Sequence, residues 1–499
     1  MLSNRTGASV PAPTNTPAAT PQPPGPAAGA RPTGPSFPPG FQWGVSTSAY
    51  QIEGAADDDG RGRSIWDTFA GVPRAITDAS TGGVACDHYH RMPEDVALLA
   101  DLGVRSYRFS IAWPRIQPTG SGRVNREGAA FYDRLVDSLL AQGIAPLATL
   151  FHWDLPQPLQ DAGGWQRRET SARFADYADA VANLLGDRVQ QWITLNEASV
   201  HTELGHLLGV HAPGLTLRPE LFGVVHHQML AHGLAVAALR ANGNVPVSIA
   251  NSYGTPWAVG PDGTRATATD ADRAAAAAFD AVHNRMYTDP ILLGRYPDEA
   301  ALLTAGGLDD IVLDGDLATI SAPIDALGVN YYNPMGLGAP VDATAALPWS
   351  FRNITGCPRT AFDWPVVPDG LREMLLLLHE QHGDRLPPIW ITENGCAVDD
   401  RPDADGAVTD DFRIDYLDQH LRAVRAAMDA GVDVRGYCVW SLLDNWEWAE
   451  GFTKRFGLVH VDYATQKRTP KASYHWYRDR IRAGNPRATR SDPGRDPAR

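Results

Sequence analysis

The sequence predicts an α/β fold, a single (β/α)8 barrel with long loops after its strands. Eight short runs rich in β-branched and aromatic residues alternate with longer helix-like runs, the order of strands and crossover helices in a parallel sheet. The strand-like runs also tend to end in polar residues. In a closed barrel, functional side chains gather at the carboxyl ends of the strands, so this second pattern supports the first.

The predicted strands have interiors of mainly Val, Ile and Leu. They cover residues 41–46, 104–110, 144–152, 189–196, 246–252, 324–332, 388–394 and 434–441. The clearest helix-like runs are 93–103, 131–143, 171–186, 372–383 and 414–431, which close on Gly, as helix C-termini often do. A doubly wound open sheet is the alternative. It would need a Gly-rich phosphate turn after the first strand, and WGVSTSAYQIEG supplies none.

The alternating pattern occupies residues 37–483, which we predict to be one catalytic barrel. Residues 1–36 are rich in Pro, Ala, Gly and Thr, and the short segment of residues 484–499 is locally basic. Both segments are predicted to be disordered tails. The first 36 residues also lack the apolar centre of a signal peptide, which favours a cytoplasmic location.

Composition excludes several kinds of partner. The net charge of −15 offers no basic surface for nucleic acid or an anionic membrane, and no stretch approaches 18 apolar residues. The four cysteines have no C-x-x-C spacing and are expected to be buried free thiols of a reducing compartment. The chain is expected to be a monomer or a homo-oligomer.

Two glutamates, Glu197 and Glu393, end the fourth and seventh predicted strands in the runs QQWITLNE and PPIWITEN. A carboxylate is costly to bury, so each needs a partner or a chemical role. Two carboxyl groups facing one cleft are the minimal apparatus for cleaving a glycosidic bond, one donating a proton and the other attacking or activating water. The structural alternative is a buried Glu–Arg pair that holds the barrel together.

Residues 440–457, WSLLDNWEWAEGFTKRFG, bring five aromatic residues together with Glu447 in a loop. A core segment would be aliphatic and periodic, and this one is neither. A sugar presents flat C–H faces and many hydroxyls, which suit aromatic platforms with carboxylates between them. The loop therefore indicates a sugar site.

No metal or organic cofactor is predicted. The close His pairs in CDHYHR (86–91) and HHQMLAHG (226–233) lack the helical spacing of a zinc site. His227 and His232 are better explained by core packing. No His cluster accompanies either Glu197 or Glu393, which argues against a metal pair there.

Seven motifs, in the same order, resemble those of glycoside hydrolase family 1, the β-glucosidase family. The resemblance covers residues 37–478. It implies a retaining double displacement by a (β/α)8 barrel. The motifs are FQWGVSTSAYQIEGA, YRFSIAWPRI, TLFHWDLPQPL, TLNE, LGVNYY, ITENG and WSLLDNWEWAEG.

By this resemblance, Glu393 is the nucleophile and Glu197 the acid/base, with carboxyl groups roughly 5–5.5 Å apart. Arg108 and Tyr332 would hydrogen-bond the nucleophile. The remaining positions would bind substrate: Gln51, His152, Asn196, Asn330, Glu447 and Trp448 at hydroxyls, Trp440 as the floor, Phe456 as a side wall and Trp364 against the aglycone.

The chain departs from the family at one position, where Ala198 follows the acid/base in place of the usual proline. Since Glu197 is intact, activity is expected to survive, with a freer backbone after the acid. Phospho-sugar members lack the Glu447–Trp448 pair and carry Ser and Lys instead, so a phosphate-free β-glucoside is favoured.

The resemblance implies hydrolysis of cellobiose, cello-oligosaccharides and aryl or alkyl β-glucosides, with possible β-galactosidase or β-fucosidase side activity. Two alternatives stay open. A non-catalytic sugar-binding protein on the same barrel usually lacks one catalytic carboxylate, and both are present here. A transglycosylase would pass the sugar to an acceptor other than water, and the surroundings of Trp364 would decide that.

Overall fold

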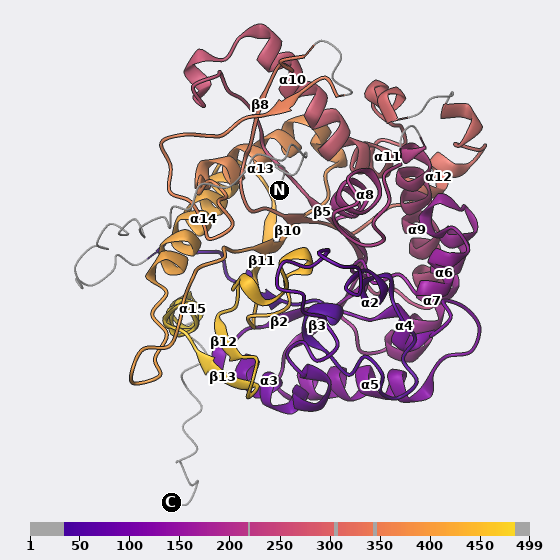
Figure 1. Ribbon diagram of the computed structural model, residues 1–499, viewed down its shortest axis with the longest axis vertical. Coiled ribbons are helices and arrows are strands. Elements are labelled where there is room, and N and C mark those ends of the chain that lie inside the picture. The colour runs from indigo at the N-terminus through magenta and orange to yellow at the C-terminus, as the bar shows by residue number, and fades with distance from the viewer. Residues whose placement is uncertain (1–33, 218–219, 304–307, 343–346, 485–499) are drawn as a thin grey trace, which may run out of the picture.

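Eight parallel strands close into a barrel in the computed structural model, which describes residues 34–217, 220–303, 308–342 and 347–484 (Figure 1). Around the barrel the order is β1-β11-β10-β7-β5-β4-β3-β2, and every neighbouring pair is parallel. The predicted fold class is therefore confirmed. The strands are β1 (Gln42–Ser46), β2 (Ser106–Ser110), β3 (Ala145–Phe151), β4 (Gln191–Asn196), β5 (Val247–Ser252), β7 (Ala326–Asn330), β10 (Ile389–Asn394) and β11 (Val434–Trp440).

Each predicted strand overlaps one barrel strand. The predicted spans run up to two residues beyond the observed ends. Backbone hydrogen bonds to the neighbouring strand continue at several of these ends, for example from the Arg105 amide to the Trp43 carbonyl (2.9 Å). Barrel strands are buried almost throughout, which is why they appear in the sequence as continuous apolar runs instead of alternating ones.

Long helices surround the barrel, and all five predicted helices are among them. Glycine ends α3 in a left-handed conformation (φ 78°) that few other residues adopt easily. The long helices are α3 (His88–Leu102), α5 (Arg126–Ala141), α7 (Glu169–Leu185), α9 (Leu221–Ala241), α10 (Asp270–Phe279), α13 (Pro368–His382), α14 (Asp411–Asp429) and α15 (Ala472–Gly484). Shorter ones are α1 (Ala49–Ile52), α2 (Ile65–Phe69), α4 (Trp113–Ile116), α6 (Gln157–Asp161), α8 (Ala198–Thr202), α11 (Asp289–Leu292) and α12 (Asp316–Ile320).

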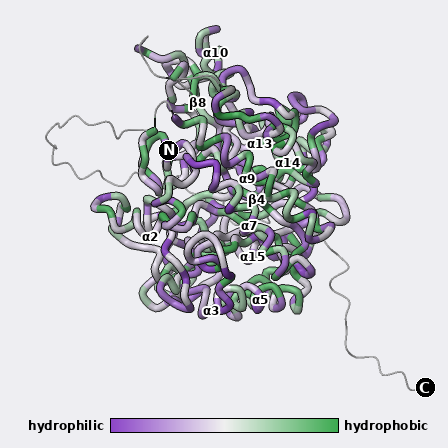
Figure 2. The backbone as a smooth tube through the Cα atoms, turned by 90° about the vertical axis from the view of Figure 1, so that its right-hand side faces the viewer, coloured by the Kyte–Doolittle hydropathy of each residue, from purple (hydrophilic) through white to green (hydrophobic). Residues whose placement is uncertain are grey.

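Two small sheets extend the barrel. β6 (Pro256–Ala258), β8 (Met335–Gly338) and β9 (Ser350–Phe351) form one, and β12 (Val459–Asp462) pairs antiparallel with β13 (Lys467–Pro470) in the other. In both views α10 and β8 lie at the end of the molecule opposite α3 and α5 (Figures 1 and 2). These additions lie in the loops that the predicted barrel required.

Helix α9 is the one described helix whose length and composition would let it cross a membrane. Its mean hydropathy is 1.2 over the most apolar window, and 78% of that window is buried inside the protein. Helix α9 packs between α7 and the barrel and is buried around most of its circumference, which explains this apolar character.

The four cysteines are free, as predicted, and Cys86, Cys396 and Cys438 are buried while Cys357 is half-buried. His227 and His232 belong to α9 and bond the Trp165 carbonyl and the Thr194 hydroxyl. The predicted tails, 1–36 and 484–499, fall almost entirely outside the described residues and stay predictions.

Candidate active site

A pocket opens at the carboxyl ends of the barrel strands, with about 1020 Å³ of empty space that includes open solvent. Many of the predicted site residues line it: His152, Glu197, Tyr332, Trp364, Glu393, Trp440, Glu447, Trp448 and Phe456. The other four, Gln51, Arg108, Asn196 and Asn330, hydrogen-bond to members of this group. The structure thus brings together all the residues singled out in the sequence.

Glu393 lies one residue before the end of β10 and is 3% exposed. The Arg108 guanidinium donates to its Oε1 (2.5 Å), and the Tyr332 hydroxyl donates to its Oε2 (2.7 Å). The two hydrogen bonds, one of them from a cation, fix the orientation of the carboxyl group. Glu393 is therefore buried and held in one orientation, as a nucleophile must be.

Glu197 has very different surroundings. Its Oε1 accepts a hydrogen bond from the Asn330 amide (2.8 Å), and among the described residues it has no ion-pair partner. Burial and the nearby charge of Glu393 raise the pKa of Glu197 to about 8. Glu197 thus retains its proton at neutral pH, as a general acid must.

The backbone at Glu197 is left-handed, with φ 48° and ψ 55°, a costly conformation for a non-glycine residue. Such strain often marks a functional residue. The following residue, Ala198, occupies the first position of α8, where proline is readily accepted. Alanine and the family's proline therefore both suit the start of this helix, in line with the expectation that activity survives.

A chain of hydrogen bonds connects the polar residues beneath the pocket. Asn196 Oδ1 accepts from Arg108 Nη2 (2.5 Å) and from Asn330 Nδ2 (3.0 Å), and its Nδ2 meets His152 Nε2 at 3.1 Å. Burial and the Arg108 charge lower the pKa of His152 well below its ordinary range, so this imidazole is neutral. Gln51 Nε2 donates to Glu447 Oε2 (3.2 Å) on the other side.

Aromatic rings form the walls. Trp440 and Phe456 belong to one apolar cluster, with Tyr332 and Trp364 packed against it. The Tyr332 and Trp364 rings meet edge to face with centroids 5.4 Å apart. Flat apolar walls around buried carboxyl groups are what a sugar ring needs.

The structural alternative for the two glutamates is half right. Glu393 does form a buried ion pair with Arg108 across the barrel, but both carboxyl groups also line the pocket. A purely structural pair exists elsewhere: Glu53 accepts from Arg115 (3.0 Å) and Tyr132 (2.6 Å) and lies outside this pocket.

Sequence reasoning missed the outer part of the pocket, which comes from loops and from helices between the strands. The polar ending of the fifth predicted strand was one available signal, since Ser252 lies in the pocket beside Glu197. Trp153 was another, since it directly follows His152 after β3 in the motif TLFHWDLPQPL. The remaining members had no local signal. They include Val200, Glu203, Leu204, Phe279, His283, Met335 and Phe351.

Among the described residues, no group of three or more His, Cys, Asp or Glu is arranged to hold a metal ion.

A stability prediction follows from the crowding of carboxyl groups. Burial and the charge of Glu393 raise the pKa of Glu447 from its ordinary value of 4.5 to about 8. Between these values the folded state holds a proton that the unfolded state has lost, so the free energy of unfolding falls as pH rises. We expect Glu447→Gln to reduce the loss of Tm between pH 5 and pH 8, measured by calorimetry. Glu450→Gln, in the same loop but half-buried, is the control, and equal pH dependence in Glu447→Gln and wild type would contradict the assignment.

Comparison with known proteins agrees with this geometry. The family model for glycosyl hydrolase family 1 matches residues 34–485. Thermostable β-glucosidase B of Thermobispora bispora is 49% identical over 90% of this chain and 91% of its own length. A bifunctional β-D-glucosidase/β-D-fucosidase of Bifidobacterium breve is 45% identical over 89% of this chain and 97% of its own.

Solved structures agree as well. The psychrophilic β-glucosidase of Micrococcus antarcticus superposes with a TM-score of 0.85 at 44% identity, covering 90% of this chain and 98% of that one. The family 1 β-glucosidase of Thermotoga maritima gives 0.84 at 42% identity, with the same coverage. With its closed barrel, its pair of buried glutamates and a family match over nearly all the described residues, the chain belongs to glycosyl hydrolase family 1.

Proposed function

We propose that this chain is a retaining β-glucosidase that removes terminal non-reducing β-D-glucosyl residues by double displacement. The observation that carries the proposal is the contrast between the two pocket glutamates. Glu393 is held by a cation and a hydroxyl, whereas Glu197 is held by a neutral amide and its pKa is raised to about 8. A cationic environment for one carboxyl group and a neutral environment for its neighbour suit the roles of nucleophile and acid, respectively.

In the first step, the Glu393 carboxylate attacks the anomeric carbon while Glu197 gives its proton to the departing glycosidic oxygen. The glycosidic C–O bond breaks, and the sugar becomes an ester of Glu393. In the second step, the Glu197 carboxylate takes a proton from water, and the hydroxide oxygen attacks the anomeric carbon. Glu393 leaves, and the product keeps the β configuration.

Asn196, within reach of both Arg108 and His152, is proposed to bind the 2-hydroxyl, whose hydrogen bonds strengthen in the transition state. Gln51, His152, Glu447 and Trp448 are proposed to bind the other hydroxyls. Among the described residues that line the pocket none is Lys or Arg, and four are Glu, which supports a phosphate-free sugar.

The outer pocket supports aryl and alkyl aglycones as well as a second glucose. Its lining includes Val200, Leu204, Phe279, Met335 and Phe351, next to Trp364. The hydrogen bond between Glu203 Oε1 and His283 Nδ1 (2.8 Å) supplies polar atoms beside this apolar surface. Cellobiose and cello-oligosaccharides remain proposed substrates. β-Galactosides and β-fucosides are proposed minor ones, since one relative acts on both glucosides and fucosides.

A panel of p-nitrophenyl glycosides tests the proposal. We expect β-glucoside to give the highest kcat/KM, β-fucoside and β-galactoside to follow, and 6-phospho-β-glucoside to be poor. NMR of the first product should show β-glucose before mutarotation. First release of α-glucose would contradict retention, and a preference for the phosphorylated substrate would contradict the assigned sugar.

The same preparation tests the two alternatives. A binding protein would turn over none of the panel. A transglycosylase would release nitrophenol faster than free glucose, because an acceptor sugar would replace water in the second step. Cytoplasmic location and a monomeric or homo-oligomeric state stay predictions, supported in the first case by the free cysteines.

A further inference from the structure

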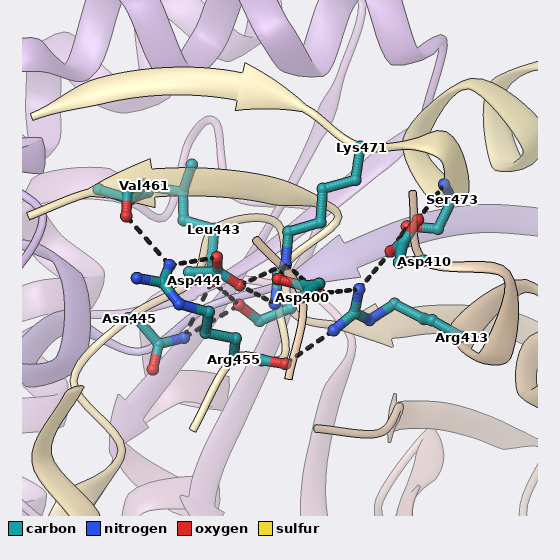
Figure 3. Close-up of polar contacts among 12 residues, drawn as sticks. Asp400, Asp410, Arg413, Leu443, Asp444, Asn445, Arg455, Val461, Lys471 and Ser473 are labelled. Atoms are coloured by element: carbon teal, nitrogen blue, oxygen red, sulfur yellow. Dashed lines mark hydrogen bonds and ion pairs between the residues drawn. The ribbon is translucent and has the colours of Figure 1, made fainter. Parts of the chain in front are cut away.

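Figure 3 shows a buried network of ionic side chains, none of which lines the pocket. The side chains of five of its members, Asp400, Asp410, Arg413, Asp444 and Lys471, have no exposed area. Three carboxylates face three cations, so the group is neutral as a whole. Its ionic members are Asp400, Asp410 and Asp444 with Arg413, Arg455 and Lys471.

Lys471, at the junction of β13 and α15, has the central ammonium. Its Nζ donates to both oxygens of Asp400 (2.8 and 3.0 Å) and to Oδ1 of Asp444 (2.7 Å). Asp400 belongs to the loop that follows Glu393 and β10, and Asp444 to the loop that follows β11. A single cation therefore joins the loop after the nucleophile to the loop that contains Glu447 (Figure 3).

Asp444 in turn joins the two halves of its own loop. Its Oδ1 accepts from the Gly457 amide (2.9 Å), and its Oδ2 accepts from Arg455 (2.8 Å). Gly457 follows Phe456, which forms a wall of the pocket. The outgoing and returning halves of the loop are thus held together at a point adjacent to a substrate-binding residue.

The next residue continues this connection into the pocket. Asn445 Oδ1 accepts from Gln51 Nε2 (3.1 Å), and the same Gln51 nitrogen donates to the Trp446 carbonyl (3.0 Å) and to Glu447 Oε2 (3.2 Å). A displacement of Asp444 would therefore reach Glu447 through one shared donor. None of the six ionic residues lines the pocket. The network is connected to the pocket through this loop and through the loop after β10.

Stability alone is a weak explanation for these ions, because well-packed apolar side chains are often as stabilising as a buried ion pair. What ions with directed hydrogen bonds add is a fixed geometry. We propose that Lys471, Asp444 and Asp400 are positioning residues that set the placement of Glu447 and Phe456 relative to Glu393. They thereby control discrimination at the substrate's 6-hydroxyl. The inference rests on the proposed function, in which Glu447 binds a sugar hydroxyl. We assign it to the 6-hydroxyl because family members that act on 6-phosphorylated sugars differ at the Glu447–Trp448 pair.

The test uses Asp444→Asn in the full chain and measures kcat/KM for p-nitrophenyl β-glucoside and for its 6-deoxy analogue. Displacement of Glu447 should weaken a contact that only the glucoside makes. We expect the ratio of the two kcat/KM values to fall about 10-fold, the scale of one lost hydrogen bond that leaves a buried polar group without its partner. Trapping with a 2-deoxy-2-fluoroglucoside counts the folded active sites, so that unfolded protein does not affect the ratio.

Asp289→Asn is the matched control. Asp289 is also buried (1% exposed) and also has two basic partners, Arg285 (2.8 Å) and His382 (3.0 Å), but it lies outside both loops. It should keep the wild-type ratio within about 2-fold. If the ratio changed equally in the two variants, the network would contribute only to stability, and the inference would be overturned.

The double variant Lys471→Met/Asp444→Asn removes one charge of each sign and leaves the network neutral. It provides a folded alternative if the single variant does not fold, and it should show the same fall in the ratio. An active wild type with an unchanged ratio in these variants overturns the positioning role alone. A wild type that hydrolyses no β-glucoside overturns the proposed function, and the inference with it.

Discussion

Glu393→Ala is expected to lower kcat for p-nitrophenyl β-glucoside roughly 10⁶-fold, the scale seen when a covalent nucleophile is deleted. Alanine offers no oxygen to bond the anomeric carbon. A water molecule in its place would attack slowly, because no general base lies on that face of the sugar. Azide is a small anionic nucleophile that can occupy the space left by the carboxylate. It should restore turnover and give α-glucosyl azide, because a single displacement inverts the anomeric centre.

Glu53→Ala is an unusually close control for this experiment. Glu53 and Glu393 are both buried, and each accepts hydrogen bonds from one arginine and one tyrosine: Arg115 and Tyr132 for Glu53, Arg108 and Tyr332 for Glu393. Breaking either ion pair should destabilise the fold by about 3–5 kcal/mol, since a buried arginine loses its partner. Only Glu393→Ala should be rescued by azide. Rescue of both variants, or a β-azide product from Glu393→Ala, would contradict the nucleophile assignment.

The barrel could be predicted from sequence because its signals are local. Each strand is a short apolar run, and the functional residues that end several of them, among them Glu197 and Glu393, follow from the geometry of parallel strands. The small sheet of β6, β8 and β9 was not predicted. Its strands are only two to four residues long, too short for any periodicity to appear.

The inner site was predicted largely through family resemblance. Spacing alone could not have paired Arg108 with Glu393, which are 285 positions apart. The same limit explains what was missed. Glu203 and His283 meet from two short helical segments, Glu203–Leu207 and Asp280–Asn284, and Lys471 reaches Asp400 across 71 positions. None of these contacts leaves a pattern in the adjoining sequence. Distances between elements became available only with the three-dimensional arrangement.

The acid/base role of Glu197 predicts an effect that depends on the leaving group. Cellobiose and alkyl glucosides need a proton on the departing oxygen, so Glu197→Gln should lower their kcat/KM about 10²–10⁴-fold. A 2,4-dinitrophenyl glucoside leaves without protonation, and its kcat/KM should change little. Its kcat should still fall, because the second step lacks a general base.

Proton affinity and stereochemistry give two further readouts of the same variant. With the pKa of Glu197 raised to about 8, wild-type kcat/KM for cellobiose should decline above that pH as the acid loses its proton, and Glu197→Gln should lack this decline. Azide should accelerate the variant and yield β-glucosyl azide, since Glu393 still performs the first inversion. Glu393→Ala should thus give α-glucosyl azide and Glu197→Gln should give β-glucosyl azide. The anomer seen in the NMR spectrum of the product therefore distinguishes the nucleophile from the acid/base. If kcat/KM of Glu197→Gln fell equally for all leaving groups and still declined at high pH, another residue would be the proton donor.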